Sequence, residues 1–183
     1  PADMGYKIRV QVRNELDALK EIPQLHSERL TLDAIAEKDR ATYNRLCLDD
    51  ERNRWWGYDY RKDLKGELTE NYFLDTARQD FQNRLAVNFA VRLNGHMVGE
   101  VVLYAFDYKG DAELGCRIVP ELAGYGYGVE AFRRAAEWSL YELGLCRLKG
   151  KCFRENAASK RMLEACMRPN GEDDTYFYFE KLV

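Results

Sequence analysis

The segment Gly124-Tyr125-Gly126-Tyr127-Gly128 is the part of this sequence whose residue types most directly indicate a binding chemistry. It follows a short apolar run that ends at Pro120, and an amphipathic pattern begins directly after it at Val129. Glycine lets the backbone approach a ligand closely and adopt dihedral angles that other residues avoid. Main-chain N–H groups at the start of a helix can then point at a bound anion such as phosphate. The order strand, glycine turn, helix therefore predicts an anion site over residues 124–129.

The glycine segment alone does not specify one phosphate-binding family. A Walker loop would end in Gly-Lys followed by Ser or Thr, and a dinucleotide fingerprint would require an acidic residue about twenty positions on, after a second parallel strand. Glu142 stands at a similar distance, but it lies inside the helical pattern. A flexible surface turn is the alternative interpretation of this segment.

Cysteine and histidine residues limit the other chemistries that the chain could perform. The five cysteines are odd in number and include no Cys-x-x-Cys, which is typical of reduced, mostly buried thiols in a cytoplasmic protein. His26 and His96 have no second ligand close in sequence, so we expect no metal site. No histidine stands near Cys116 to activate it, so we do not expect an acyl-cysteine intermediate.

Composition favours one globular domain with a substantial core. The chain has 183 residues, of which 46% are hydrophobic and 13% aromatic, and this is ample for a core. Its net charge of −3 and its lack of basic runs argue against nucleic acid as the main partner. It has neither an apolar run long enough for a membrane span nor the apolar stretch of a signal peptide near residue 1. We therefore expect a cytoplasmic protein that does not use the membrane.

Strand and helix patterns alternate along the chain. Asn94-Gly95 is the strongest hairpin signal, Gly144 is a plausible helix stop, and Asn170-Gly171 is predicted to turn the chain. Three antiparallel strands thus lead into the glycine segment, and a mixed sheet with helices on both faces is expected. The predicted strands are 28–32, 88–93, 97–106, 112–119, 146–153 and 175–182, and the predicted helices are 36–48, 67–83, 129–143 and 156–166.

Residues 1–24 are predicted to form an N-terminal extension to a domain spanning 25–183. Residues 6–13 alternate between apolar and charged or polar side chains, as in a half-buried strand, and Asn14 is placed to cap a short helix over 16–22. We expect that this extension is an appendage or the remnant of a longer chain. Pro1 in place of methionine indicates a processed start, a cloning remnant or a cut from a longer chain.

Two further features have a structural and a functional interpretation. Residues 53–60 form the most aromatic segment, predicted as a loop that either packs internally or walls a pocket. The acidic groups at 49–51 and 172–174 are typical of solvated turns, but at the rim of a cleft they would attract a cationic amine.

An ordered set of motifs resembles the GNAT acyl-CoA N-acetyltransferases, and within them the Rim-type (RimJ/RimL-like) ribosomal-protein acetyltransferases. The resemblance covers about residues 25–168 and is strongest over 113–163. It implies an α/β (α+β) fold with a mixed, mostly antiparallel sheet and helices on both faces. One parallel pair of strands in this sheet is expected to splay apart. The motifs are Glu113-Leu114-Gly115-Cys116-Arg117-Ile118-Val119-Pro120, the glycine segment, and Glu155-Asn156-Ala157-Ala158-Ser159-Lys160-Arg161-Met162-Leu163.

The resemblance also implies a set of cofactor contacts for acetyl-CoA, with no metal. Gly126 and Gly128 match the family's phosphate loop, whereas Ala123 stands where the family has Arg or Gln. The loss of that side chain removes a polar contact or a loop brace and puts cofactor affinity in doubt. The implied contacts are the main chain of Cys116 and Ile118, the loop residues Gly124, Tyr125, Gly126, Tyr127, Gly128 and Val129, and the side chains of Asn156 and Ser159.

The resemblance implies acetyl transfer to a primary amine by direct attack in a ternary complex. Such an amine has a pKa of about 10 and arrives protonated, so a base must take its proton. Glu113 is the candidate base and Glu100 the reserve, while Ser159 would return a proton to the leaving thiolate. Each has a structural alternative: Glu113 is also an ordinary strand-end carboxylate, Asn156 a helix N-cap, and Ser159 a first-turn residue.

The acceptor and the assembly are left open by the sequence. The Rim-type resemblance favours a protein or peptide N-terminus over a small amine. However, Met167-Arg168-Pro169 stands where the family has Gly-Phe after Cys166, which weakens that inference. A non-catalytic acyl-CoA sensor and a structural interaction domain are the rival hypotheses. A homodimer stays open as an assembly.

Overall fold

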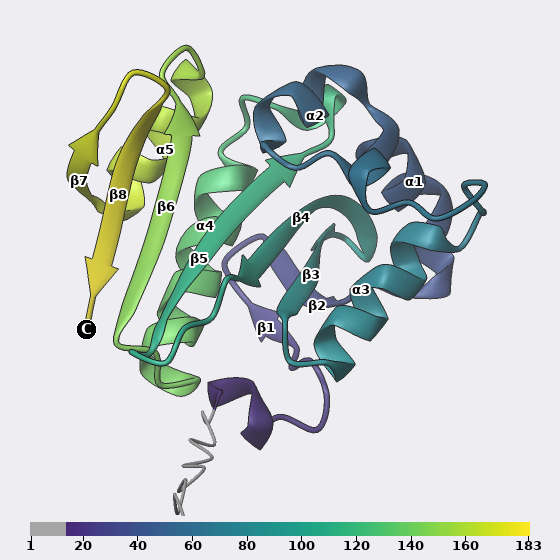
Figure 1. Cartoon of the computed structure of the whole chain (residues 1–183), viewed down its shortest axis with the longest axis horizontal. Coiled ribbons are helices and arrows are strands. Elements are labelled where there is room, and N and C mark those ends of the chain that lie inside the picture. The colour runs from purple at the N-terminus through teal and green to yellow at the C-terminus, as the bar shows by residue number, and fades with distance from the viewer. Residues whose placement is uncertain (1–13) are drawn as a thin grey trace, which may run out of the picture.

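Eight strands form one sheet in the computed structural model of this chain, which describes residues 14–183 (Figure 1). The strand predicted over 6–13 lies outside the described residues. The spatial order of the strands is β1-β2-β3-β4-β5-β6-β8-β7, and every neighbouring pair is antiparallel except β5–β6. The strands are β1 (Leu25–His26), β2 (Leu30–Ala34), β3 (Ala86–Leu93), β4 (His96–Tyr104), β5 (Asp111–Ile118), β6 (Arg147–Phe153), β7 (Arg168–Glu172) and β8 (Tyr176–Leu182).

Helices cover both faces of this sheet. The strand–helix–strand unit β5–α4–β6 makes β5 and β6 parallel, as predicted for a helical crossover. The mixed, mostly antiparallel sheet predicted from the sequence is therefore confirmed. The helices α1 to α3 lie over β3, β4 and β5, and α4 and α5 lie on the opposite face (Figure 1). They are α1 (Arg40–Leu48), α2 (Asp50–Trp56), α3 (Tyr72–Gln82), α4 (Tyr127–Glu137) and α5 (Ala157–Cys166).

The main hydrophobic core lies between the sheet and α4. Phe132 of α4 and Phe89 of β3 are fully buried, and the ring of Phe89 packs edge-on against Trp138 at 5.4 Å. A second apolar cluster lies on the other face, where Tyr43 and Phe73 join α1 to α3. Leu16, within the predicted N-terminal extension, is also fully buried in the main core.

Local turn and cap signals were predicted correctly at several positions. Asn94 and Gly95 both have positive φ, 51° and 81°, as a two-residue hairpin turn requires. Gly144 ends the helical segment after α4 with a φ of 96°. Asn14 accepts a hydrogen bond from the Leu16 amide and caps the short 3₁₀ helix Glu15–Ala18.

Three sequence predictions are wrong in detail. Residues 50–56 form helix α2 instead of a loop, because Asp49 accepts a hydrogen bond from the Arg52 amide at 2.8 Å and Gly57 ends the helix at a φ of 79°. Asn170-Gly171 does not turn the chain but lies in an irregular stretch of β7, and the turn is made around Asp173. The segment after α4, Trp138–Glu142, is π-helical.

Candidate active site

Strands β5 and β6 pair at one end and part at the other. Their pairing covers only Asp111–Glu113 against Arg147–Lys149. Beyond that point β5 stays bonded to β4 up to Ile118, and β6 stays bonded to β8 up to Phe153. One backbone edge of β5 from Leu114 onward is therefore open, and a cavity of about 730 Å³ lies along it. This is the parted strand pair that the sequence predicted.

The glycine loop closes one end of this cavity. Gly124 and Gly126 have φ values of 87° and 83°, a left-handed backbone that glycine adopts without strain, and Gly126 is the N-cap of α4. The first amide of α4 with a protein acceptor is that of Glu130, which donates to the Gly126 carbonyl at 3.1 Å. Within residues 14–183, none of the six amides from 124 to 129 donates to a protein group.

Most of the predicted loop residues line the cavity, with one exception. Gly124, Gly126, Tyr127, Gly128 and Val129 are in its wall. The Tyr125 side chain points outward, with 61% of its surface exposed, and its ring stacks on Tyr127 at 6.0 Å. The loop therefore offers free N–H donors and a helix N-terminus to the cavity, an arrangement suited to an anion.

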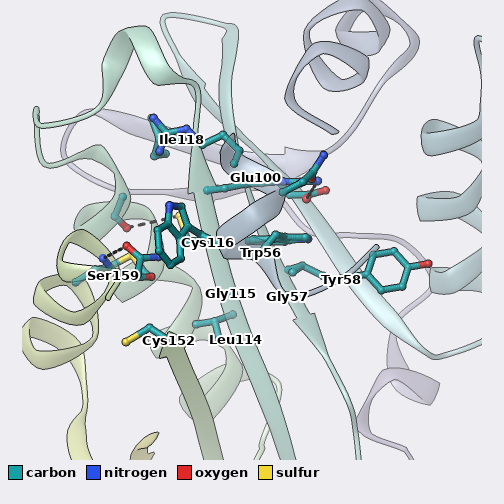
Figure 2. A pocket seen from close by; sticks show the side chains of 18 of the residues that line it. Trp56, Gly57, Tyr58, Glu100, Leu114, Gly115, Cys116, Ile118, Cys152 and Ser159 are labelled. Carbon is teal, nitrogen blue, oxygen red and sulfur yellow. Dashed lines mark hydrogen bonds and ion pairs between the residues drawn. The ribbon is translucent and has the colours of Figure 1, made fainter. Parts of the chain in front are cut away.

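Asn156 and Ser159 lie across the parted strands from β5, at the start of α5. The Asn156 side-chain oxygen accepts a hydrogen bond from the Ser159 amide at 3.2 Å and so caps the helix. Both residues also line the cavity. Figure 2 shows Ser159 and Cys152 on one side of β5, and Trp56 and Tyr58 on the other. The capping interpretation of Asn156 is correct, and it does not exclude a contact with a bound molecule.

Cys116 is a half-buried cysteine on β5 that lines the cavity. Its sulfur lies 3.8 Å from the Gly128 carbonyl, to which the S–H donates. Burial raises the pKa of Cys116 to about 12, so the side chain is an uncharged thiol at neutral pH. This agrees with the expectation that no acyl-cysteine forms. Ile118, two residues on, packs beside α4, where its Cγ1 lies 3.6 Å from a Cβ built on Gly128.

A buried ion pair forms the wall on the α2 side of the cavity. The Glu100 carboxylate, 1% exposed, lies 3.1 Å from an Arg117 nitrogen. Asn88 donates a second hydrogen bond to Glu100 at 3.2 Å, and the Trp56 ring lies over the Arg117 guanidinium at 4.3 Å. All four residues line the cavity. Sequence reasoning missed Arg117 and Asn88, because only the β3–β4–β5 register brings them to Glu100.

Glu113 lies where β5 and β6 still pair, opposite Tyr104 on β4. Glu113 is not among the residues that line the cavity, whereas Tyr104 is. Burial raises the pKa of Tyr104. The negative charge of Glu113 and the hydrogen bond between Tyr104 and Glu113 raise this pKa further. The sequence named Glu113 and Glu100 as candidate bases. Only Glu100 lies in the cavity wall, whereas Glu113 lies next to the hydroxyl of Tyr104, which lines the cavity.

Two tryptophans at the end of helix α2 contact both of the parted strands. Trp56 lies above β5, and its nearest ring atom would be 3.4 Å from a Cβ at Gly115, which is van der Waals contact, so the ring packs directly on this strand. Trp55 packs edge-on against Phe153 at the end of β6, at 5.9 Å. The aromatic residues predicted as either packing or a pocket wall do both, since Trp55, Trp56 and Tyr58 also line the cavity.

Over 14–183, no group of three or more His, Cys, Asp and Glu side chains is arranged to hold a metal ion. No helix in the same part of the chain combines the length and apolar character needed to cross a membrane.

Comparison with known proteins identifies the family to which this fold and site belong. Residues 29–166 match the acetyltransferase (GNAT) domain family, and the chain is a member of that family. It is an acetyltransferase, as the ordered motifs indicated. The chain is also 24% identical over 144 residues to an uncharacterized N-acetyltransferase, YoaA, of Bacillus subtilis, covering 77% of this chain and 80% of that protein.

Solved structures confirm the fold. A GNAT-family acetyltransferase from Bacillus anthracis aligns with a TM-score of 0.73 at 21% identity, covering 87% of this chain and 98% of the other. RimL, a ribosomal L7/L12 alpha-N-protein acetyltransferase bound to coenzyme A, aligns at 0.73 and 14% identity, covering 88% and 98%. RimJ of Mycobacterium smegmatis aligns at 0.70 and 17% identity, covering 88% and 87%. The structural relatives thus include the Rim-type branch.

Proposed function

We propose that this acetyltransferase moves the acetyl group of acetyl-CoA to a primary amine by direct attack within a ternary complex. The observation that carries the proposal is the set of amides at 124–129 that have no acceptor within residues 14–183 and adjoin a cavity beside the parted strands β5 and β6. These features provide, in one continuous space, an anion site and an open strand edge.

In this proposal the diphosphate of CoA binds the loop amides and the N-terminus of α4. The pantetheine arm runs along the open edge of β5, where the backbone of residues 114–118 no longer meets β6. The main chain of Cys116 and Ile118 then contacts the cofactor, and Asn156 contacts the arm from the other side. Backbone N–H groups near Cys116 would stabilise the oxyanion that forms on the thioester carbonyl.

The transfer forms one C–N bond and breaks one C–S bond. The amine nitrogen attacks the carbonyl carbon, the tetrahedral intermediate collapses, and the sulfur leaves as a thiolate that must gain a proton. We assign this proton donation to Ser159, which lines the cavity at the start of α5 and faces the parted strands. Its hydroxyl acts directly or through one water molecule.

The amine must lose a proton, and the chain offers two carboxylates to accept it. Glu100 lies in the cavity wall, ion-paired with Arg117 at 3.1 Å, a position that suits a base receiving the proton inside the cleft. Glu113, the candidate from the sequence, can act only through a group such as the Tyr104 hydroxyl, which lines the cavity. We favour Glu100 as the base and retain Glu113 as the alternative.

The acceptor enters from the side of the cavity that α1, α2 and α3 cover. A protein or peptide N-terminus is the acceptor that the Rim-type relatives support, since RimL is named for acetylation of the N-terminus of a ribosomal protein. The residues that wall this side are largely aromatic and include Trp55, Trp56, Tyr58, Tyr60 and Phe73. A small amine with an apolar body fits the same wall.

The decisive experiment measures CoA binding and turnover on one preparation. Calorimetry with CoA gives the dissociation constant, and CoA release from acetyl-CoA is then followed across a panel of peptides and small amines. Binding together with turnover on any amine supports the proposal. Binding without turnover on any amine supports a non-catalytic acyl-CoA sensor, and no CoA binding overturns the cofactor assignment.

A further inference from the structure

Arg29, in the turn between β1 and β2, bonds the glycine loop 124–128 and the first turn of α4. The Arg29 guanidinium donates to the Glu130 carboxylate at 2.7 Å through Nε and to the Tyr125 carbonyl at 3.0 Å through Nη1. It also lies over the Tyr127 ring at 4.7 Å. These contacts join a residue near the start of the domain to three residues of the loop and the first turn of α4.

The Tyr125 contact sets the direction of a neighbouring amide. The Tyr125 carbonyl and the Gly126 N–H belong to one planar trans peptide unit, so they point in opposite directions. Gly126 lines the cavity, whereas Arg29 does not. By holding the Tyr125 oxygen on the outer side of the loop, Arg29 turns the Gly126 N–H toward the side on which the cavity lies.

The Glu130 contact removes an opposing charge. Glu130 is in the first turn of α4, close to the amides that would bind an anion. Its carboxylate accepts hydrogen bonds from the Ser27 hydroxyl at 2.5 Å and from the Arg29 amide at 2.9 Å, besides the guanidinium. Burial opposes ionisation of Glu130, but these hydrogen bonds lower its pKa overall. Arg29 therefore neutralises a fixed negative charge that would otherwise repel a diphosphate.

Among the described residues, no side chain of the loop itself bonds the Tyr125 carbonyl or the Glu130 carboxylate. Ala123, at the position where the resembled family has Arg or Gln, offers only a methyl group, and its amide donates to Pro120. Arg29 approaches the loop from outside instead, with Nη2 only 3.3 Å from a Cβ built on Gly126.

We propose that Arg29 is a positioning residue for the cofactor's diphosphate, acting on the loop from outside the cavity. It orients the Gly126 amide and neutralises Glu130. The inference rests on the proposed function, because it needs the loop to bind CoA, and it adds a residue that neither the loop motif nor the cavity lining identifies.

The test compares Arg29 with Arg134, a second arginine that links the β1–β2 hairpin to α4. Arg134 of α4 donates to the His26 carbonyl at 2.8 Å and pairs with Glu142, and over residues 14–183 its side chain has no hydrogen bond or ion pair with Glu130 or residues 124–129. With CoA as the calorimetric probe, we expect R29A to weaken binding about tenfold and R134A to change it less than about twofold. KM for acetyl-CoA should rise in R29A while kcat stays near the wild-type value, as expected for lost cofactor binding.

Further variants separate the two actions of Arg29. R29K keeps a positive charge near Glu130 but replaces the two separate donors Nε and Nη1 with a single nitrogen, so its affinity should fall between wild type and R29A. Combining R29A with E130Q should recover part of the lost affinity, because the uncompensated carboxylate is gone. Circular dichroism checks the fold of each variant, and if R29A does not fold, R29K against R134A decides.

The two proposals fail differently. If the wild-type chain does not bind CoA, the proposed function and this inference are both overturned. If the wild type binds CoA while R29A and R29K bind it as tightly as R134A does, the cofactor assignment stands and the role of Arg29 is wrong.

Discussion

The cavity has two halves that are built from different parts of the polypeptide. The loop half, residues 124–129 with the open edge of β5, presents main-chain N–H and C=O groups. The ion-pair half, formed by Asn88, Glu100, Arg117 and Trp56, presents side chains from three strands and a helix. A main-chain site depends on backbone conformation, whereas a side-chain site depends on which residues the fold brings together.

This difference predicts different responses to substitution. In the loop half most side chains can change, provided that the backbone keeps its positive φ angles at Gly124 and Gly126. In the ion-pair half the charges of Glu100 and Arg117 are paired with each other, and removing one partner leaves a buried charge, which costs about 3–5 kcal/mol. Four experiments test this comparison, from the largest expected effect to the smallest.

Replacing Gly126 with glutamate should have the largest effect, weakening CoA binding at least about 100-fold. The new carboxylate would stand against the diphosphate, and a residue other than glycine is strained at a φ of 83°. G171E is the matched control, because Gly171 also has a positive φ, of 116°, has open space around it and does not line the cavity. Equal CoA affinity in G126E and G171E would remove the loop from the binding site.

Removing the negative charge of Glu100 should lower kcat about 100-fold, the scale of general-base catalysis. E113Q is the paired variant, and we expect it to change kcat less than about threefold. Thermal unfolding separates lost catalysis from instability, since E100Q leaves the Arg117 charge without its partner. The opposite ranking of the two variants would transfer the base role to Glu113.

Replacing Ser159 with alanine should lower kcat about tenfold and leave the CoA dissociation constant within about twofold of wild type. The hydroxyl is assigned to the leaving thiolate and contributes little to ground-state binding. Steady-state kinetics and calorimetry on the same preparation measure both quantities. Unchanged kcat would exclude Ser159 from the mechanism.

We expect the smallest effect on turnover from alkylation of the cysteine thiols. Burial raises the pKa of both Cys47 and Cys116 to about 12, so at pH 8 each stays protonated and unreactive. One equivalent of iodoacetamide should therefore label the exposed Cys146 and leave turnover unchanged, as mass spectrometry and activity assays can show. Labelling of Cys47 and Cys116 should increase only as the pH rises toward their pKa. Rapid labelling of Cys116 at pH 8 with loss of activity would reopen a covalent route.

The sequence by itself determined the loop half to a large extent. The glycines at 124–128, the cap at Asn156 and the hairpin at Asn94-Gly95 each depend on local backbone chemistry, which neighbouring residues specify. Helix α2 was predicted wrongly as a loop. Its aromatic residues favoured that interpretation, although Asp49 caps the helix and Gly57 ends it.

Only the tertiary structure decided the ion-pair half and the Arg29 contact. Glu100 meets Arg117 because the β4–β5 register places them opposite each other, 17 positions apart in the chain. Arg29 meets Tyr125 across 96 positions, because α4 packs against the sheet beside the β1–β2 turn. A side chain's partners across such separations follow from strand register and helix packing, which involve the whole chain, whereas a glycine's backbone freedom belongs to the residue itself.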